Sequence, residues 1–136
     1  MQRRLAAARV GHLATAGADG RPHVVPVTFA LEEDAIFFAV DAKPKRTTNL
    51  TRLRNITANP RVALLVDHYE EEWTGLWWVR VDGTARVLAE GPIADHAQRL
   101  LASKYEQYRA VRPPGPVVAI SIDRMTGWSA ADHAAR

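Results

Sequence analysis

The sequence predicts a mainly β fold of the α+β class, a small antiparallel barrel with helices packed outside it. Six or so short segments have the pattern of strands, and most of them follow one another through short turns. Only two longer segments repeat their apolar residues with the helical period. The chain has 136 residues, of which 47% are hydrophobic and 24% charged, so we expect one globular domain spanning residues 1–136.

The first third of the chain predicts a short helix followed by three strands. Residues 2–9 predict the helix, and residues 10–15 predict the first strand, which ends at the glycine-containing turn 17–20. This turn joins two strands and lacks the GxGxxG spacing, so a Rossmann fold is not expected. The next strand covers residues 22–30 and contains Pro26, which cannot donate to a ladder, so we expect it at a sheet edge or a bulge. Residues 35–40 form an apolar run, typical of a strand buried on both sides.

The middle of the chain predicts a helix and two long strands. Residues 46–58 predict the helix, because Leu50, Leu53 and Ile56 recur every three residues. Thr47 or Thr48 is the expected N-cap. Strands follow at residues 61–69 and 76–88, separated by the acidic loop 70–75, and the second is long enough to bend around a barrel.

The last third predicts a second helix and a final strand. The helix begins near Pro92 and runs to about Gln107, with one apolar side formed by Ile93, Ala97, Leu100, Leu101, Tyr105 and Tyr108. Residues 112–116 break it, and a strand over residues 117–122 continues toward Trp128. The tail after Asp132 is expected to fray.

Composition excludes several kinds of chemistry. The chain has no cysteine, so it has no disulfide, thiolate nucleophile or zinc-thiolate site. Its five histidines are not at metal-ligand spacing, and its serines lie in no GxSxG turn, so neither a metal site nor a hydrolase triad is expected. No apolar run approaches the roughly 18–20 residues of a membrane span, and we expect a soluble cytoplasmic protein without a membrane partner.

Positive charge is concentrated in one segment. Between Ala42 and Val66 there is no acidic residue, and the segment carries one third of the 18 cations of the chain, at positions 43, 45, 46, 52, 54 and 61. One interpretation is a solvated basic helix face. The other is an anion site for a phosphorylated ligand. Aromatic residues do not interleave with these cations, so nucleic-acid binding is not expected.

The motifs along the chain resemble, in their order and spacing, those of a known superfamily. They are HLAT at 12–15, DGRPHVVPV at 19–27, IFF at 36–38, KPKRT at 43–47, NL at 49–50, NPRVALLV at 59–66 and WVRVDGTA at 78–85. Together they resemble the split β-barrel flavin and deazaflavin oxidoreductases related to pyridoxamine 5′-phosphate oxidase. More narrowly, the chain resembles the PPOX-class F420-dependent oxidoreductases of actinobacteria, over about residues 2 to 130.

The resemblance implies a homodimer that holds two cofactors in clefts between the subunits, each cofactor touched by both chains. The size of the fold agrees, because a small barrel has too little interior for a ring system as large as a flavin. An external apolar groove is best covered by a second subunit.

The resemblance also implies a phosphate site in the basic segment. Lys43, Lys45 and Arg46 occupy the loop where relatives hold the cofactor phosphate, and Thr47 adds a hydroxyl at the helix start, where an anion is favoured. Arg52 either joins these cations or lies on a solvated helix face.

The cofactor ring is expected beside two strands. Val25, Pro26, Val27 and Thr28 match the strand whose backbone lies along the ring in the family, and Ala39, Val40 and Asp41 run beside it. The alternative for both strands is barrel core. Trp78 stands where pyridoxamine-phosphate oxidases place a polar contact, which favours another activity. Arg80, on the same strand face, either reaches an acidic cofactor tail or pairs with Asp82 or Glu90.

The implied activity is hydride transfer between reduced F420 and a small organic substrate. The basic excess favours F420, whose oligoglutamate tail is acidic, but an FMN-binding reductase or oxidase of the same fold remains an alternative. A non-catalytic cofactor-binding protein is the third possibility. The substrate stays open, and Tyr69, His68 and a bound water are all candidate proton donors to it.

Overall fold

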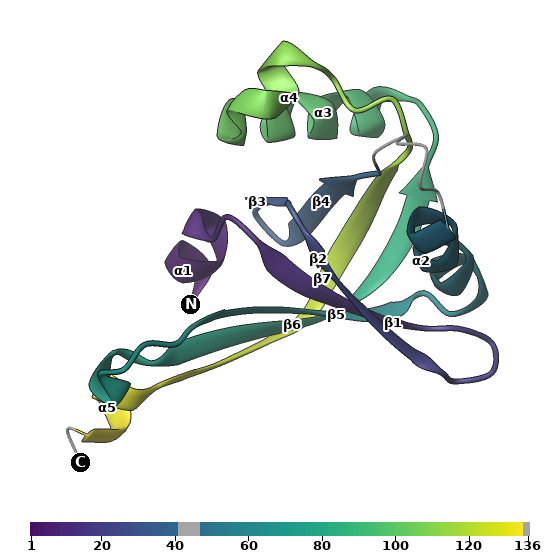
Figure 1. The fold of residues 1–136 in the computed structure, drawn as a ribbon. Coiled ribbons are helices and arrows are strands. Elements are labelled where there is room, and N and C mark those ends of the chain that lie inside the picture. Colours follow the sequence, from purple (N-terminus) through teal and green to yellow (C-terminus); the bar gives the residue numbers. More distant parts are fainter. Residues whose placement is uncertain (41–46, 135–136) are drawn as a thin grey trace.

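The computed structural model describes residues 1–40 and 47–134, with side chains placed for residues 1–40 and 51–132. The described residues form seven strands, five α-helices and one 3-10 helix (Figure 1). The elements are, in chain order, α1 (Gln2–Ala7), β1 (Gly11–Ala16), β2 (Pro22–Val27), β3 (Ala30–Glu32), β4 (Ala35–Ala39), α2 (Thr47–Ala58), β5 (Arg61–His68), η1 (Trp73–Gly75), β6 (Trp77–Leu88), α3 (Pro92–Lys104), α4 (Glu106–Ala110), β7 (Val117–Ser129) and α5 (Ala130–Ala134).

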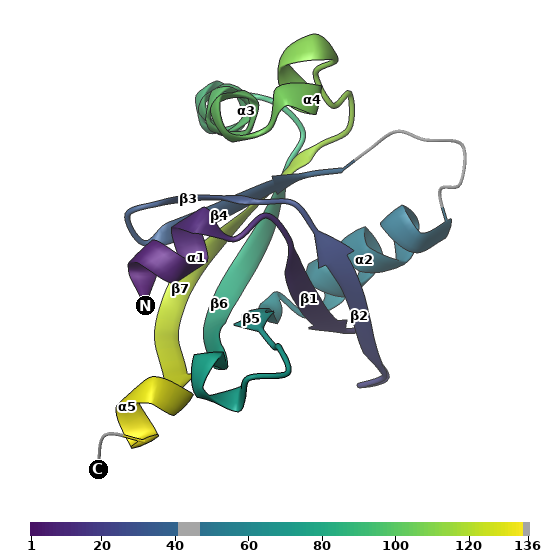
Figure 2. The same ribbon diagram turned by 60° about the vertical axis from the view of Figure 1, so that its left-hand side comes forward.

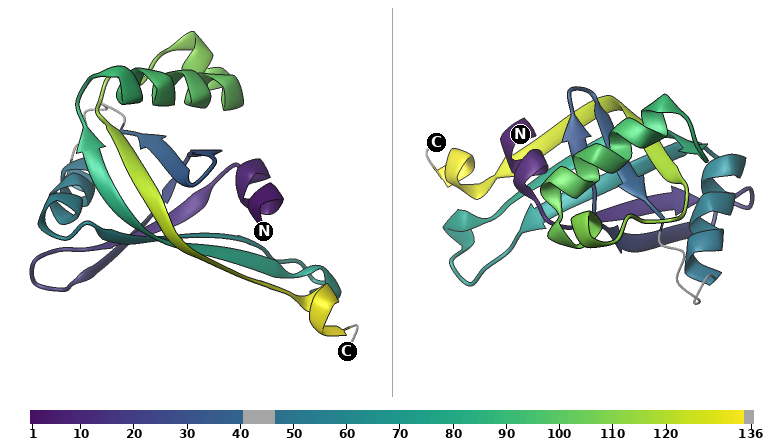
Figure 3. Two further views of the ribbon diagram at one scale, coloured as in Figure 1. Left: turned by 180° about the vertical axis from the view of Figure 1, so that it is seen from behind. Right: turned by 90° about the horizontal axis from the view of Figure 1, so that it is seen from above.

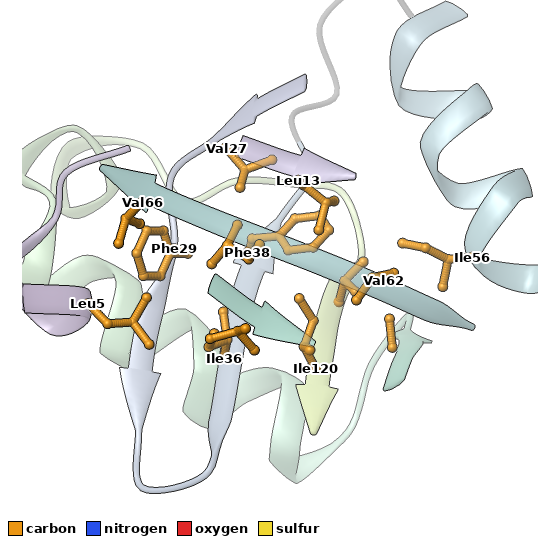
Figure 4. Close-up of a cluster of buried hydrophobic side chains, with 14 of the residues drawn as sticks. Leu5, Leu13, Val27, Phe29, Ile36, Phe38, Ile56, Val62, Val66 and Ile120 are labelled. Carbon is orange, nitrogen blue, oxygen red and sulfur yellow. The ribbon is translucent and has the colours of Figure 1, made fainter. Parts of the chain in front are cut away.

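All seven strands belong to one antiparallel sheet in the order β2-β1-β5-β6-β7-β4-β3. The sheet curls around a core of side chains from its inner face, several of which Figure 4 shows together. The fully or nearly fully buried members include Leu5, Leu13, Phe29, Ile36, Phe38, Leu64, Val79, Val81 and Ile120. The register of β6 and β7 shifts at Asp82 and Gly83, a bulge that helps the long pair to bend. The predicted antiparallel barrel with external helices is confirmed.

The two ends of the sheet, β2 and β3, meet at the short link 28–29. β2 is an edge strand, as Pro26 predicted. The strand expected over residues 22–30 is therefore wrong in one respect, because the chain turns a corner at Thr28 and Phe29 and leaves β2 to begin β3. Within the described residues no ladder joins β2 to β3. We call this junction the seam.

Helix α3 covers the outer face of β4 and β7 (Figure 3, right). Phe37 of β4 packs with Ala94 and Ala97 of the helix, while Ile36 and Phe38 point into the barrel. The prediction that this strand is buried on both sides is confirmed.

Helix α2 lies beside β1 and β2 in Figure 2 and closes one end of the barrel. Ile56 enters the core, and Leu53 packs against it, as the predicted apolar stripe requires. The Asn55 Nδ2 donates to Thr15 Oγ1 of β1 at 3.1 Å, which ties the helix to the sheet.

The expected single helix from Pro92 to Gln107 is wrong, because it breaks at Tyr105 into α3 and α4. Tyr105 is extended, with φ −118° and ψ 120°. Ile93, placed on the apolar side, is 44% exposed. The tail after Asp132 does not fray at once, since α5 continues to Ala134.

The ends of β5, β6 and β7 extend beyond the barrel as an arm that carries η1 and α5 (Figures 1 and 3). Trp73 at its tip is exposed. Arg4 of α1 lies over the Trp77 ring at 5.0 Å, which joins α1 to the arm. Among the helices described, none combines the length and apolar character needed to cross a membrane.

Candidate functional site

The outer face of β2, β1, β5 and the first half of β6 differs from the face that α3 covers. Residues alternate between the two faces of a strand, so the neighbours of core residues point outward here. The ladders align them in two rows across five strands, which are Pro26, His12, Leu65, Arg80 and Thr126, and Val24, Ala14, Ala63, Asp82 and Arg124. The side chains at positions 12, 24, 26 and 80 remain exposed in the single chain.

These rows form a groove of about 440 Å³, which we call the outer-face groove. Ala14 and Ala63 are ladder partners and form its floor. Val24, Leu65 and Trp78 add apolar walls around them. Because the floor consists of methyl groups, a flat ring can lie close to the backbone there, and a larger side chain at either alanine would fill that space.

Polar groups stand around this apolar floor. His12, Asp67, Tyr69 and Arg80 all line the groove. The Arg80 Nε lies 3.5 Å from Asp82 Oδ2, with both side chains more than 40% exposed. The predicted pairing of Arg80 with Asp82 is thus present, but it is a solvent-exposed contact that holds the arginine weakly.

Two of the sequence-predicted residues come together in the groove, and a third lies farther away on the same face of the sheet. Trp78 and Arg80 both line the groove, two residues apart on one strand. Pro26 lies in the same row as Arg80, three strand spacings or about 14 Å away.

Other predicted residues lie on the opposite, core side of the sheet. Val27 and Val40 are buried in the core, and Val25 packs against it. The Val40 N–H donates to Pro116 O at 3.0 Å, so this backbone donor is already used. Arg52 is only 9% exposed, with its Cζ 5.7 Å from the centre of the Phe38 ring, so it does not lie on a solvated helix face.

The remaining predicted residues are not in the groove. Thr28 bonds to the Tyr108 hydroxyl at the seam, and Ala39 packs against the residues beneath α3. Asp41, Lys43, Lys45 and Arg46 lie outside the described residues, as does the side chain of Thr47, the first residue of α2.

Sequence reasoning missed His12 and Asp67 as groove residues. His12 was assigned no role at a cofactor or substrate site, although strand alternation already places its side chain on the opposite face from Leu13 and on the same face as Ala14. The two named candidate proton donors are separated by the fold. Tyr69 lines the groove, but His68 stacks on Trp77 and bonds to Glu70 Oε2 at 2.6 Å on the other side of the arm.

The described side chains contain no group of three or more His, Asp or Glu residues arranged to hold a metal ion. The lining of the groove, an apolar floor with a few polar groups at its rim, has the composition of an organic-ligand site.

Residues 1–129 match the pyridoxamine 5′-phosphate oxidase family. The chain belongs to that family. Family membership confirms the predicted resemblance to the split β-barrel superfamily related to pyridoxamine 5′-phosphate oxidase. The narrower resemblance to F420-dependent oxidoreductases stays a prediction.

The proteins that this chain resembles have different described functions. The chain is 34% identical over 82 residues to a 5a,11a-dehydrotetracycline/5a,11a-dehydrooxytetracycline reductase of Streptomyces rimosus. That alignment spans 60% of this chain and 56% of the reductase. A FAD-binding protein from Mesorhizobium loti superposes with a TM-score of 0.69 at 28% identity, over 93% of this chain and 89% of that one. A conserved hypothetical protein from Mycobacterium tuberculosis gives a TM-score of 0.76 at 20% identity, over 97% and 84%.

Proposed function

We propose that the protein is an oxidoreductase that binds coenzyme F420 against the outer-face groove and reduces a small organic substrate. The observation that carries the proposal is the flat floor of Ala14 and Ala63 with Arg80 at the rim. When bound, the deazaflavin supplies the hydride chemistry. The similarity to a reductase that acts on dehydrotetracyclines supports the direction of the reaction.

The chain's own residues have three tasks in this proposal. Ala14 and Ala63 leave room for the ring, and Leu65 and Trp78 keep water from it. Arg80, whose contact to Asp82 is solvent-exposed, is available to pair with the acidic tail of F420. FMN has no such tail, so it uses the same floor but gains nothing from Arg80.

His12 and Tyr69 are the residues that we propose for proton supply to the substrate, because both line the groove and carry an exchangeable proton. His68 is assigned no such role, since its ring lies against Trp77.

We further propose that the active form is a homodimer. The groove and the buried Arg52 lie on opposite faces of the same sheet, so one chain does not present both to a single ligand. A second copy laid over the outer face covers the exposed Val24 and the half-buried Leu65 and brings its own basic segment to the groove of the first. Light scattering at micromolar concentration should give the dimer mass, and a monomer would contradict this arrangement.

The identity of the cofactor is tested by parallel titrations with F420 and FMN. Binding is monitored through the quenching of the fluorescence of the four tryptophans. We expect F420 to bind at micromolar concentration or tighter and FMN to bind more weakly. The reverse preference would assign the protein to the flavin branch, and binding of neither would contradict the proposal.

Substitutions test whether the cofactor ring lies on the alanine floor of the groove. Ala63→Leu fills the floor and should weaken F420 binding by about a hundredfold, through lost contact area and steric exclusion. Ala58→Leu makes the same change at an exposed position at the end of α2 and should leave affinity unchanged. Equal affinities of the two variants would place the ring elsewhere.

Two substitutions of charged residues distinguish binding of the F420 tail from binding of the cofactor phosphate. Arg80→Met should weaken F420 binding by about tenfold and leave FMN binding unchanged, whereas Lys45→Ala with Arg46→Ala should weaken both by at least about tenfold. Loss of FMN affinity in Arg80→Met would contradict the tail assignment.

A further inference from the structure

A second pocket, of about 640 Å³, lies at the seam and shares no lining residue with the outer-face groove. We call it the seam pocket. Three separate parts of the chain line it, namely Arg9 before β1, Thr28 between β2 and β3, and residues 104–109 around the break between α3 and α4. Figures 1 and 2 show these helices lying together above the sheet.

The seam pocket is positively charged. Arg9, Lys104 and Arg109 line it, against one carboxylate, Glu106. Among the residues with placed side chains, none of the three cations forms an ion pair. This differs from Arg80 and Arg112, each of which has a carboxylate partner.

The bonds of these cations instead go to backbone carbonyls. Arg9 Nη1 donates to Lys104 O at 2.7 Å, Lys104 Nζ donates to Phe29 O at 2.8 Å, and Arg109 Nη1 donates to Ala102 O at 2.9 Å. These bonds fix the positions of the cations. A guanidinium has five N–H groups and an ammonium three, so donors remain on each.

Lys104 is the most confined of the three. Its Nζ lies 4.2 Å from the centre of the Phe29 ring and 5.3 Å from that of Tyr105. Burial and the nearby Arg9 lower the pKa of Lys104 to about 8. An anion in the pocket would compensate for both effects.

Hydroxyl groups complete the lining. The Thr28 Oγ1 and the Tyr108 hydroxyl lie 2.8 Å apart. Only one of their two protons lies between them, so the other is available to a further acceptor. We propose that the seam pocket binds a small molecule through an oxyanion, a carboxylate or a phosphate, held by Arg9, Lys104 and Arg109 with a hydroxyl of the Thr28–Tyr108 pair.

The test is the chemical reactivity of Lys104 in the full-length protein. Lys104 is one of three lysines in the chain, so acetylation by trace acetic anhydride can be followed at this residue by peptide mapping. Inorganic phosphate and benzoate, each compared with chloride at equal ionic strength, should slow labelling of Lys104 severalfold by millimolar concentration. Protection by one alone identifies the phosphate or the carboxylate class, and no protection by either overturns the proposal.

A matched pair of substitutions distinguishes anion binding in the seam pocket from a general effect of positive charge on the protein. Arg109→Gln should raise the anion concentration that gives half protection by about tenfold. Arg99→Gln removes an exposed cation from the same helical region outside the pocket and should change nothing. Equal effects of the two, with both variants folded by circular dichroism, would overturn the proposal.

The pH dependence provides a second readout. The charged and titratable groups facing Lys104 are Arg9, Glu106, Tyr105, Tyr108 and Arg109. Because the ammonium loses its proton near pH 8, the affinity for benzoate, whose own charge is constant over this range, should fall as pH rises from 7 to 9. Calorimetry with Lys104→Met should show weaker binding that no longer falls across this range, and an unchanged pH profile would show that Lys104 is not part of the site.

Discussion

The substitution Tyr105→Phe removes a single hydroxyl oxygen at the seam. We expect it to lower the free energy of unfolding more than the loss of an ordinary hydroxyl group would. The Tyr105 hydroxyl accepts from the Phe29 N–H at 3.1 Å and donates to Arg9 O at 2.9 Å or to Phe29 O at 3.1 Å. Phe29 is fully buried. The hydroxyl therefore satisfies backbone groups at the corner where the sheet has no ladder.

The magnitude follows from what each group keeps after the substitution. The Phe29 carbonyl still accepts from Lys104 Nζ at 2.8 Å, whereas the Phe29 N–H loses its partner. A buried polar group left without a partner costs about 1–3 kcal/mol, so we expect a loss of about 2 kcal/mol. Tyr108→Phe is the matched control. Within the described part of the chain its hydroxyl bonds only to another side chain, Thr28, at a half-buried position, so the substitution should cost about 0.5–1 kcal/mol.

Urea unfolding measures the difference. With a slope of about 2 kcal/mol per molar, the Tyr105→Phe midpoint should fall by about 1 M, and that of Tyr108→Phe by about 0.25–0.5 M. Protein concentration is held constant, because association would shift the midpoints. Equal midpoints for the two variants would refute the claim that the Tyr105 hydroxyl satisfies the buried backbone groups of the seam.

Three further outcomes follow from the structure. Gly83→Ala should cost about 2–4 kcal/mol in urea unfolding, because its Cβ would lie 2.6 Å from the backbone oxygen of Ser121, and wild-type stability in this variant would contradict that packing. Between about pH 8 and 10.5, wild type should gain stability relative to Lys104→Met, since the folded state has lost the Lys104 proton that the unfolded state still holds. Parallel pH profiles of the two proteins would exclude a lowered Lys104 pKa. Asn55→Ala should lower the free energy of unfolding by about 1 kcal/mol through loss of its bond to Thr15, and no change in the thermal midpoint would argue against that tether.

Local patterns were sufficient for most of the fold. The apolar run in β4 predicted burial on both faces, and Pro26 predicted an edge strand, because both arguments depend only on backbone geometry. The break at Tyr105 was not predictable in this way. The apolar spacing continues through Tyr105 and Tyr108, but the Tyr105 hydroxyl bonds to Phe29, 76 residues away in sequence, where the chain leaves the helical path.

The candidate site was predicted only in part, for the same reason. Trp78 and Arg80 share a face because they are two residues apart, and both line the groove. Val25, Pro26 and Val27 are consecutive, so alternation allows only the middle side chain to point outward. The alanine floor depends on the pairing of β1 with β5, a long-range register that no local pattern contains.

The strand registers on the two sides of the seam are independent of each other. Since side chains rather than a ladder join β2 to β3 within the described residues, a slip or insertion in the β1–β2 hairpin need not propagate into the β3–β4 hairpin. The turn at residues 17–21 can therefore vary in length independently of the strands on the far side of the barrel. The two hairpins share the barrel core and the link at residues 28–29, where Tyr105 and Lys104 bond to the backbone of Phe29.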